Sequence, residues 1–220
     1  MMSWPSINRA VAGATEFTSM YESFADLTTV NKQHFVEWFS GSALDSIWTK
    51  TDISGTGTFA MVDAVDEGFS LTCGGAGGES AINFNDKRQY SQTASVIIGI
   101  VKGNNTTGSF KLELQNNKSF SDTGGVSHFV GYEFHTSVTN FALRSSDNSV
   151  ISRTESDIAR DNSWHTASLT LTSGNCNLAI DGVSKVDKTT NLPADKLQPR
   201  LWSGSSAQEA RIRYCEAYNT

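Results

Sequence analysis

Apolar and polar residues alternate along most of the chain. The pattern is clearest over residues 165–172, where Leu169 and Leu171 share one face with Ala and polar residues take the other. A period of two residues is typical of a strand with one buried face. Turn-forming residues follow at 173–175, and a second alternating segment begins at 176–180. We therefore expect an antiparallel meander in this region.

Short segments of the same kind recur elsewhere, separated by Gly, Asn and Asp. The run 94–101 is continuously apolar, which indicates a central strand covered on both faces. Further strands are expected at 57–64, 68–73, 80–84, 109–114, 128–136, 140–144, 150–153, 183–186, 197–203 and 210–217. This density of strands and turns predicts an all-β fold, a two-sheet antiparallel sandwich of the jelly-roll type.

Residues 1–30 have a different pattern. Within 6–25 the apolar residues are spaced by three and four, which favours an amphipathic helix. We therefore divide the chain into an N-terminal arm or short helix (1–30) and a sandwich domain (31–220). The arm could pack on its own sandwich or become ordered on a neighbouring subunit. Its apolar stripe includes Ile7, Val11, Phe17, Tyr21 and Phe24.

The charge and the cysteine content limit the classes of binding partner that we expect. The 220-residue chain has a formal net charge of −6, and an acidic surface repels phosphate, so no nucleic-acid partner is expected. Cys73, Cys176 and Cys215 have no metal-binding spacing, which favours buried reduced thiols. The N-terminus lacks the apolar core of a secretory signal, and no segment is long enough to span a membrane, so no membrane partner is expected.

Two motifs resemble a known superfamily. Trp164-His165, followed by alternating residues and then by Leu-Ala-Ile-Asp-Gly at 178–182, resembles the concanavalin A-like lectin/glucanase (laminin-G-like) sandwiches. The segment FVEWFSGSALDSIW, which starts at residue 35, resembles the opening of laminarinase-like glycoside hydrolases and their non-catalytic relatives. The resemblance implies the sandwich fold, with structural roles for Phe39, Leu44 and Trp48.

The candidate chemistry lies in 130–136, which reads VGYEFHT. The laminarinase-like strand carries two Glu around a central Asp, because retaining hydrolysis needs two carboxyl groups about 5 Å apart. This chain has Glu133, but His135 stands at the Asp position and 136–139 contain no carboxylate. These residues predict a protein that is not an enzyme.

The same strand resembles the metal-binding segment of legume lectins. Glu133 and His135 could in principle hold one transition ion. A solvated or interface face of a strand is the favoured interpretation, so no metal or other cofactor is expected.

The sequence also leaves open the possibility that the protein binds a sugar without a metal ion. Lectin sites in sandwiches combine exposed aromatic rings with hydrogen-bonding side chains. Trp202, Tyr132, Tyr90 and Arg200 are the candidates, although each also fits a core or edge position.

The patterns over 35–218 are similar to concanavalin-like domains of tailed-phage structural proteins. The leading hypothesis is therefore a non-enzymatic virion protein, either a capsid decoration or tail-associated. It would be synthesised in the host cytoplasm without a signal peptide and would contact itself and other virion proteins, such as major capsid or tail subunits. The alternative is a carbohydrate-binding module for host-surface or environmental glycans, and a glycoside hydrolase is a third hypothesis.

Overall fold

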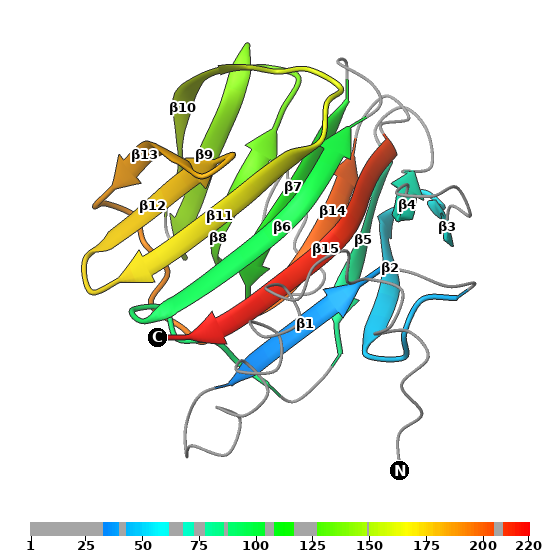
Figure 1. The fold of residues 1–220 in the computed structure, drawn as a ribbon, viewed down its shortest axis with the longest axis horizontal. Helices are drawn as coiled ribbons and strands as arrows, with labels where there is room; N and C mark the ends of the chain where they lie inside the picture. Colours follow the sequence, from blue (N-terminus) through cyan, green and yellow to red (C-terminus); the bar gives the residue numbers. More distant parts are fainter. Residues whose placement is uncertain are drawn as a thin grey trace, which may run out of the picture.

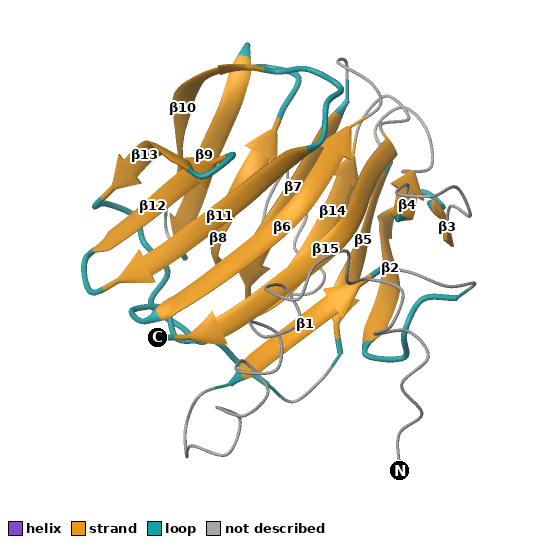
Figure 2. Cartoon of the chain, viewed as in Figure 1, coloured by secondary structure: helices purple, strands orange, loops and turns teal. Residues whose placement is uncertain are grey.

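The computed structural model describes residues 33–39, 43–61, 68–72, 78–85, 88–103, 108–116, 127–148, 150–204 and 209–220. Within these ranges the chain forms strands, turns and loops but no helix, and none of it could cross a membrane as a helix (Figure 2). The predicted N-terminal arm, with Ile7, Val11, Phe17, Tyr21 and Phe24, lies outside the described residues, as does Cys73.

The strands form two antiparallel sheets packed face to face (Figure 1). Sheet A has the order β13 (Val183–Lys188), β12 (Asn175–Ile180), β11 (His165–Thr172), β6 (Ser95–Gly103), β15 (Glu209–Asn219), β4 (Phe69–Thr72) and β3 (Thr58–Met61), and β1 (His34–Trp38) also pairs with β15. Sheet B has the order β10 (Ile151–Ala159), β9 (Asn140–Asp147), β8 (His128–Phe134), β7 (Ser109–Gln115), β14 (Gln198–Gly204), β5 (Glu79–Phe84) and β2 (Trp48–Ser54). The predicted all-β, two-sheet sandwich is confirmed.

The core lies between the sheets and follows from the alternation. In β8, Tyr132 points inward, where its ring centroid lies 5.2 Å from that of Phe141 and 6.0 Å from that of Phe110. The two sheets approach each other closely at Gly99 of β6, where an added Cβ would lie 2.2 Å from Leu112 Cδ2. A side chain at this position would therefore displace Leu112 in the core.

The predicted meander is confirmed, and its two motif halves meet. β11 pairs with β12, and β12 pairs with β13. At the end of this unit Asp181 Oδ2 lies 2.8 Å from His165 Nδ1, and Asp181 Oδ1 accepts a hydrogen bond from Thr166 N at 2.9 Å. The Trp-His and Ile-Asp-Gly segments are therefore joined by side-chain contacts that fix the start of β11 against the following turn.

Candidate functional site

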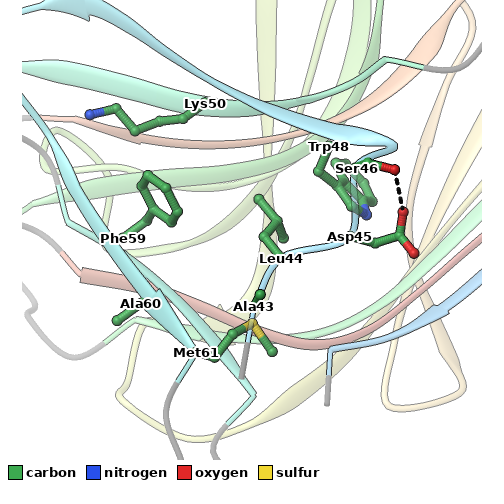
Figure 3. Close-up of a pocket in the computed structure, with 9 residues that line it drawn as sticks. All are labelled: Ala43, Leu44, Asp45, Ser46, Trp48, Lys50, Phe59, Ala60 and Met61. Atoms are coloured by element: carbon green, nitrogen blue, oxygen red, sulfur yellow. Dashed lines mark hydrogen bonds between the residues drawn. The ribbon is translucent and has the colours of Figure 1, made fainter. Parts of the chain in front are cut away.

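An open pocket lies at one edge of the sandwich, between β2, β3 and the segment 43–46 (Figure 3). Its cavity volume is about 540 Å³. Figure 3 shows apolar side chains around the space, with a lysine at one side and a carboxylate at the other. The residues that line it are Ala43, Leu44, Asp45, Ser46, Trp48, Lys50, Phe59, Ala60 and Met61.

The pocket combines an exposed aromatic ring with fixed polar groups. Phe59 is 47% exposed, and Lys50 Nζ lies 5.8 Å from its ring centroid. Lys50 is held in place by Asp52 Oδ2 at 2.8 Å and by the Gly57 carbonyl at 2.6 Å. On the opposite side, Asp45 Oδ1 accepts a hydrogen bond from the backbone N–H of residue 47 at 2.9 Å. A cavity of this size, with apolar side chains and a few oriented polar groups in its lining, is large enough to admit a small molecule.

A second candidate is the outward side of sheet B, which carries charged residues where the inward side carries the core. Strand pairing places these residues in two neighbouring rows across β14, β7 and β8. The first row is Trp202, Lys111 and Glu133, and the second is Arg200, Glu113 and Gly131. The five residues with side chains in these rows are each no more than 2% exposed.

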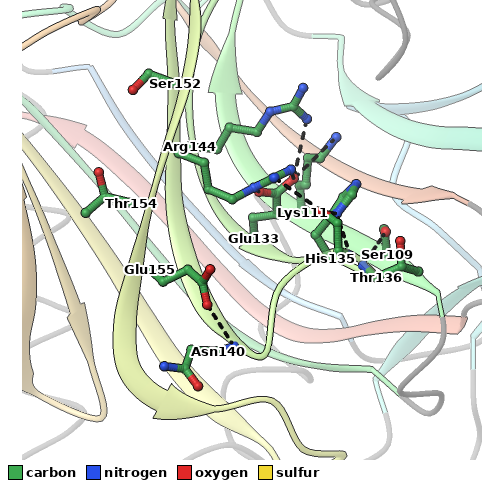
Figure 4. A network of polar contacts seen from close by, with 12 residues as sticks. Ser109, Lys111, Glu133, His135, Thr136, Asn140, Arg144, Ser152, Thr154 and Glu155 are labelled. Atoms are coloured by element: carbon green, nitrogen blue, oxygen red, sulfur yellow. Dashed lines mark hydrogen bonds and ion pairs between the residues drawn. The ribbon is translucent and has the colours of Figure 1, made fainter.

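Glu133 is the centre of a buried ionic cluster (Figure 4). Its carboxylate lies 2.5 Å from Arg153 Nε, 3.4 Å from Arg144 Nη1 and 4.0 Å from Lys111 Nζ. Burial alone would raise the pKa of Glu133, but Lys111, Arg153 and Arg144 together outweigh burial and lower this pKa below its ordinary value. Glu133 is therefore ionised at neutral pH, and three cations from β7, β9 and β10 are directed at it.

The structure does not bring Glu133 and His135 together as metal ligands. Ser137 N donates to His135 Nδ1 at 3.0 Å, whereas Glu133 is surrounded by cations that would repel a metal ion. Among the described residues there is no group of three or more His, Cys, Asp or Glu side chains that could hold a metal.

The predicted sugar-binding residues occupy closed positions. Tyr132 and Tyr90 belong to the core and are 0% exposed, so they offer no face for stacking on a sugar. Trp202 and Arg200 are each 1% exposed on the outward side of sheet B. The Trp202 ring is covered by Lys111 Nζ at 3.8 Å from its centroid. Phe59 is an exposed aromatic residue near polar groups, and sequence reasoning did not select it.

Sequence reasoning also missed Glu113. Arg200 Nε lies 3.2 Å from its Oε1. Glu113 pairs with Gly131 across the β7–β8 ladder, and a Cβ at Gly131 would lie 2.9 Å from Glu113 Cβ. Glu113 and Glu133 are therefore diagonal neighbours on one face, with Gly131 opposite Glu113 and Lys111 opposite Glu133.

Known structures share this architecture. A native glycosidic hydrolase matches with a TM-score of 0.62 and 16% identity, over 87% of this chain and 98% of that one. A Bacillus licheniformis β-glucanase matches with a TM-score of 0.60 and 15% identity, over 85% and 98% of the two chains. A carbohydrate-binding module from Bacillus subtilis matches with a TM-score of 0.52 and 11% identity, over 74% and 91%. The fold is the concanavalin A-like sandwich. The sequence matches no family model and no curated protein.

These likenesses contradict the prediction that the protein is not an enzyme, because a glycosidic hydrolase and a β-glucanase share its sandwich. The prediction considered carboxylates on one strand alone. In the structure another carboxylate, Glu113, lies near Glu133 on the adjacent strand β7. At identities of 11% to 16%, the likeness shows a shared fold and not a shared reaction.

Proposed function

We propose that the protein binds carbohydrate and that the pocket around Phe59 is the binding site. The observation that carries this proposal is the combination of a 47% exposed aromatic ring with oriented polar groups in one cavity. An aromatic face can cover the apolar face of a sugar ring, while Lys50 and Asp45 can bond its hydroxyl groups. The proposal is supported by the fold, which is also that of a carbohydrate-binding module.

The test is glycan binding by wild type, Phe59→Ala and a matched control, Trp38→Ala. Trp38 is 42% exposed, but it lies on β1 rather than at the pocket. Native gel electrophoresis in soluble glycans, with β-glucans among them, should show wild-type retardation. We expect Phe59→Ala to bind roughly tenfold more weakly, equivalent to about 1.4 kcal/mol, and Trp38→Ala to bind normally. The proposal is wrong if no glycan retards wild type or if the two variants behave alike.

Hydrolysis of a glycan is the second candidate, and it rests on the diagonal pair Glu113 and Glu133, which are 2% and 0% exposed and would have to become accessible to a substrate. Diagonal neighbours across two strands have Cα atoms roughly 7 to 8 Å apart and somewhat closer Cβ atoms. Catalytic carboxyl groups of glycosidases are about 5 to 9.5 Å apart. Glu133, held ionised by its cations, would serve as nucleophile or base, and Glu113 would be the partner carboxyl.

This candidate is tested by the release of reducing ends from the same glycans. Release by wild type that is lost in both Glu113→Gln and Glu133→Gln would support it, provided that each variant still melts cooperatively above the assay temperature. Glu216→Gln, on sheet A, is the matched control and should retain activity. Wild-type protein that binds a glycan without releasing ends would reject hydrolysis of that glycan and leave the binding proposal intact.

We also retain a finer proposal, made from the sequence patterns, that the chain is a capsid-decorating or tail-associated protein of a phage virion. Glycan binding and a structural role are compatible in one protein. Light scattering of the full chain tests self-association. An oligomer at micromolar concentration would support a role as a self-assembling subunit, and a strictly monomeric chain would count against it.

A further inference from the structure

The outward side of sheet A carries an unexpected apolar surface over β1, β15 and β6. Strand pairing arranges nine residues in three rows of three. The rows are His34, Tyr218 and Val96, then Val36, Glu216 and Ile98, then Trp38, Tyr214 and Ile100. We call this surface the nine-residue face. Except for Val96, all its members are half-buried or exposed, and Trp38 is 42% exposed.

The one carboxylate on this face is satisfied within it. Glu216 Oε1 lies 2.8 Å from His34 Nε2, and its Oε2 accepts a hydrogen bond from the Tyr214 hydroxyl at 2.5 Å. The rings pack in pairs, because Trp38 and Tyr214 have centroids 4.6 Å apart, and those of His34 and Tyr218 are 5.6 Å apart. The face is therefore an ordered, mainly apolar platform.

The platform ends where the sheet becomes polar. On β11 the outward residues next to β6 are Thr166, Ser168 and Thr170. An ordinary solvated sheet would have such residues throughout. A contiguous apolar patch beside a polar surface indicates an interaction site.

The chain outside the described residues begins beside this face. Gln33 precedes β1, and its carbonyl accepts a hydrogen bond from Asn219 N at 3.1 Å, next to the row that contains Tyr218. Residues 26–33 can span at most roughly 26 Å. The three rows extend over five residues of each strand, and the four steps between them cover roughly 14 Å. Any part of the face is therefore within reach of a segment that ends at residue 25.

The dimensions and chemistry of that segment match the face. Three strands about 4.8 Å apart make a surface about as wide as one helix, which is roughly 10 Å across. Three helical turns are about 16 Å long, close to the length of the face. Residues 6–25 have an apolar stripe at helical spacing that includes Val11, Phe17 and Tyr21.

We propose that the apolar stripe of residues 6–25 packs on the nine-residue face of the same chain. The short tether favours the same chain over a second copy, because it gives the segment an effective concentration in the millimolar range. The segment then covers Trp38 and the apolar rows of β15 and β6 in the free protein.

The test uses the full chain with a photo-crosslinking amino acid at position 17 or at position 19. Ser19 is the matched control, because two residues further along a helix it points away from the stripe. We expect crosslinking from 17 at monomer mass to peptides that contain Trp38, Ile98 or Tyr214, and little from 19. Products of dimer mass would assign the face to a second copy. Products to other surfaces, or equal yields from 17 and 19, would also overturn the proposal.

Hydrogen exchange supplies a second readout with full-chain variants. Phe17→Asp should accelerate amide exchange in 34–38 and 214–218, while Ser19→Asp should leave it unchanged. Exchange in β8, on the other sheet, should be the same in all three proteins. Unchanged exchange at 34–38 in Phe17→Asp would refute the docking.

Discussion

Replacing Glu133 with Gln tests whether its carboxylate holds sheet B together. Gln keeps the shape of the side chain but cannot balance the charges of Lys111, Arg144 and Arg153, which lie within 4.0 Å of the carboxylate. Glu133 is fully buried, and breaking a buried ion pair from one side costs about 3 to 5 kcal/mol. For a chain of this size each kcal/mol lowers Tm by about 2 to 4 °C, so we expect Tm to fall by roughly 6 to 20 °C.

The measurements are thermal and urea unfolding at pH 7, followed by tryptophan fluorescence, of wild type, Glu133→Gln and Glu216→Gln. Glu216 is the matched control, because its side chain is 19% exposed and, among the described residues, it forms an ion pair with His34 alone. We expect it to lose about 1 to 2 kcal/mol. If Glu133→Gln loses no more than Glu216→Gln, the assignment of a stabilising role to the buried carboxylate is refuted.

The same pair of proteins has a predictable pH dependence. The pKa of Glu133 is lower in the folded protein than its ordinary value, so its contribution to stability is fully present above the unfolded pKa of about 4.3. The contribution is lost as the pH falls through the folded pKa. The stability difference between wild type and Glu133→Gln should therefore be constant from pH 6 to 8 and should narrow in acid.

Three further changes have defined outcomes. Burial would lower the pKa of His165, but hydrogen bonds to its two Asp partners raise it. The stability lost in His165→Gln should therefore be greatest below pH 6.5 and disappear at alkaline pH. Urea titrations from pH 5 to 9 would contradict this if the loss of stability grew with pH. Gly131→Ala should cost about 1 to 3 kcal/mol because its Cβ would meet Glu113, and an unchanged urea midpoint would show that Glu113 moves freely. Burial raises the pKa of the Cys176 thiol to about 12, so Ellman's reagent at pH 8 should modify this thiol only after unfolding. If peptide mass spectrometry finds fast modification in the native protein, the thiol is accessible and the prediction is wrong.

The sequence predicted most strands because alternation is a local signal. β2 was missed because its segment, WTKTDIS, has apolar residues only at Trp48 and Ile53, which fall on opposite faces of a strand. The core position of Tyr132 was available from the sequence, since it must face away from its charged neighbour Glu133. Both faces of that strand carry aromatic residues, which hid this signal.

The arrangement of residues around the candidate sites could not be predicted from local sequence patterns. Glu113 alternates correctly within its own strand, but its place beside β8 depends on which strands pair. The pocket at Phe59 likewise needs β2, β3 and the segment 43–46 to meet, and no local pattern reports such a contact. Phe59 alone has the sequence signature of an ordinary strand residue.

The position of β15 in sheet A has a consequence for how the protein is made. β15 is the last strand of the chain, yet it lies between β6 on one side and β1 and β4 on the other. His34 meets its partner Glu216, which is 182 positions away. Contacts this distant in sequence close slowly, because the chain must first lose the entropy of the intervening loop. During synthesis sheet A therefore stays incomplete until β15 has left the ribosome, and until then the unpaired edge of β6 leaves the nascent chain prone to aggregation.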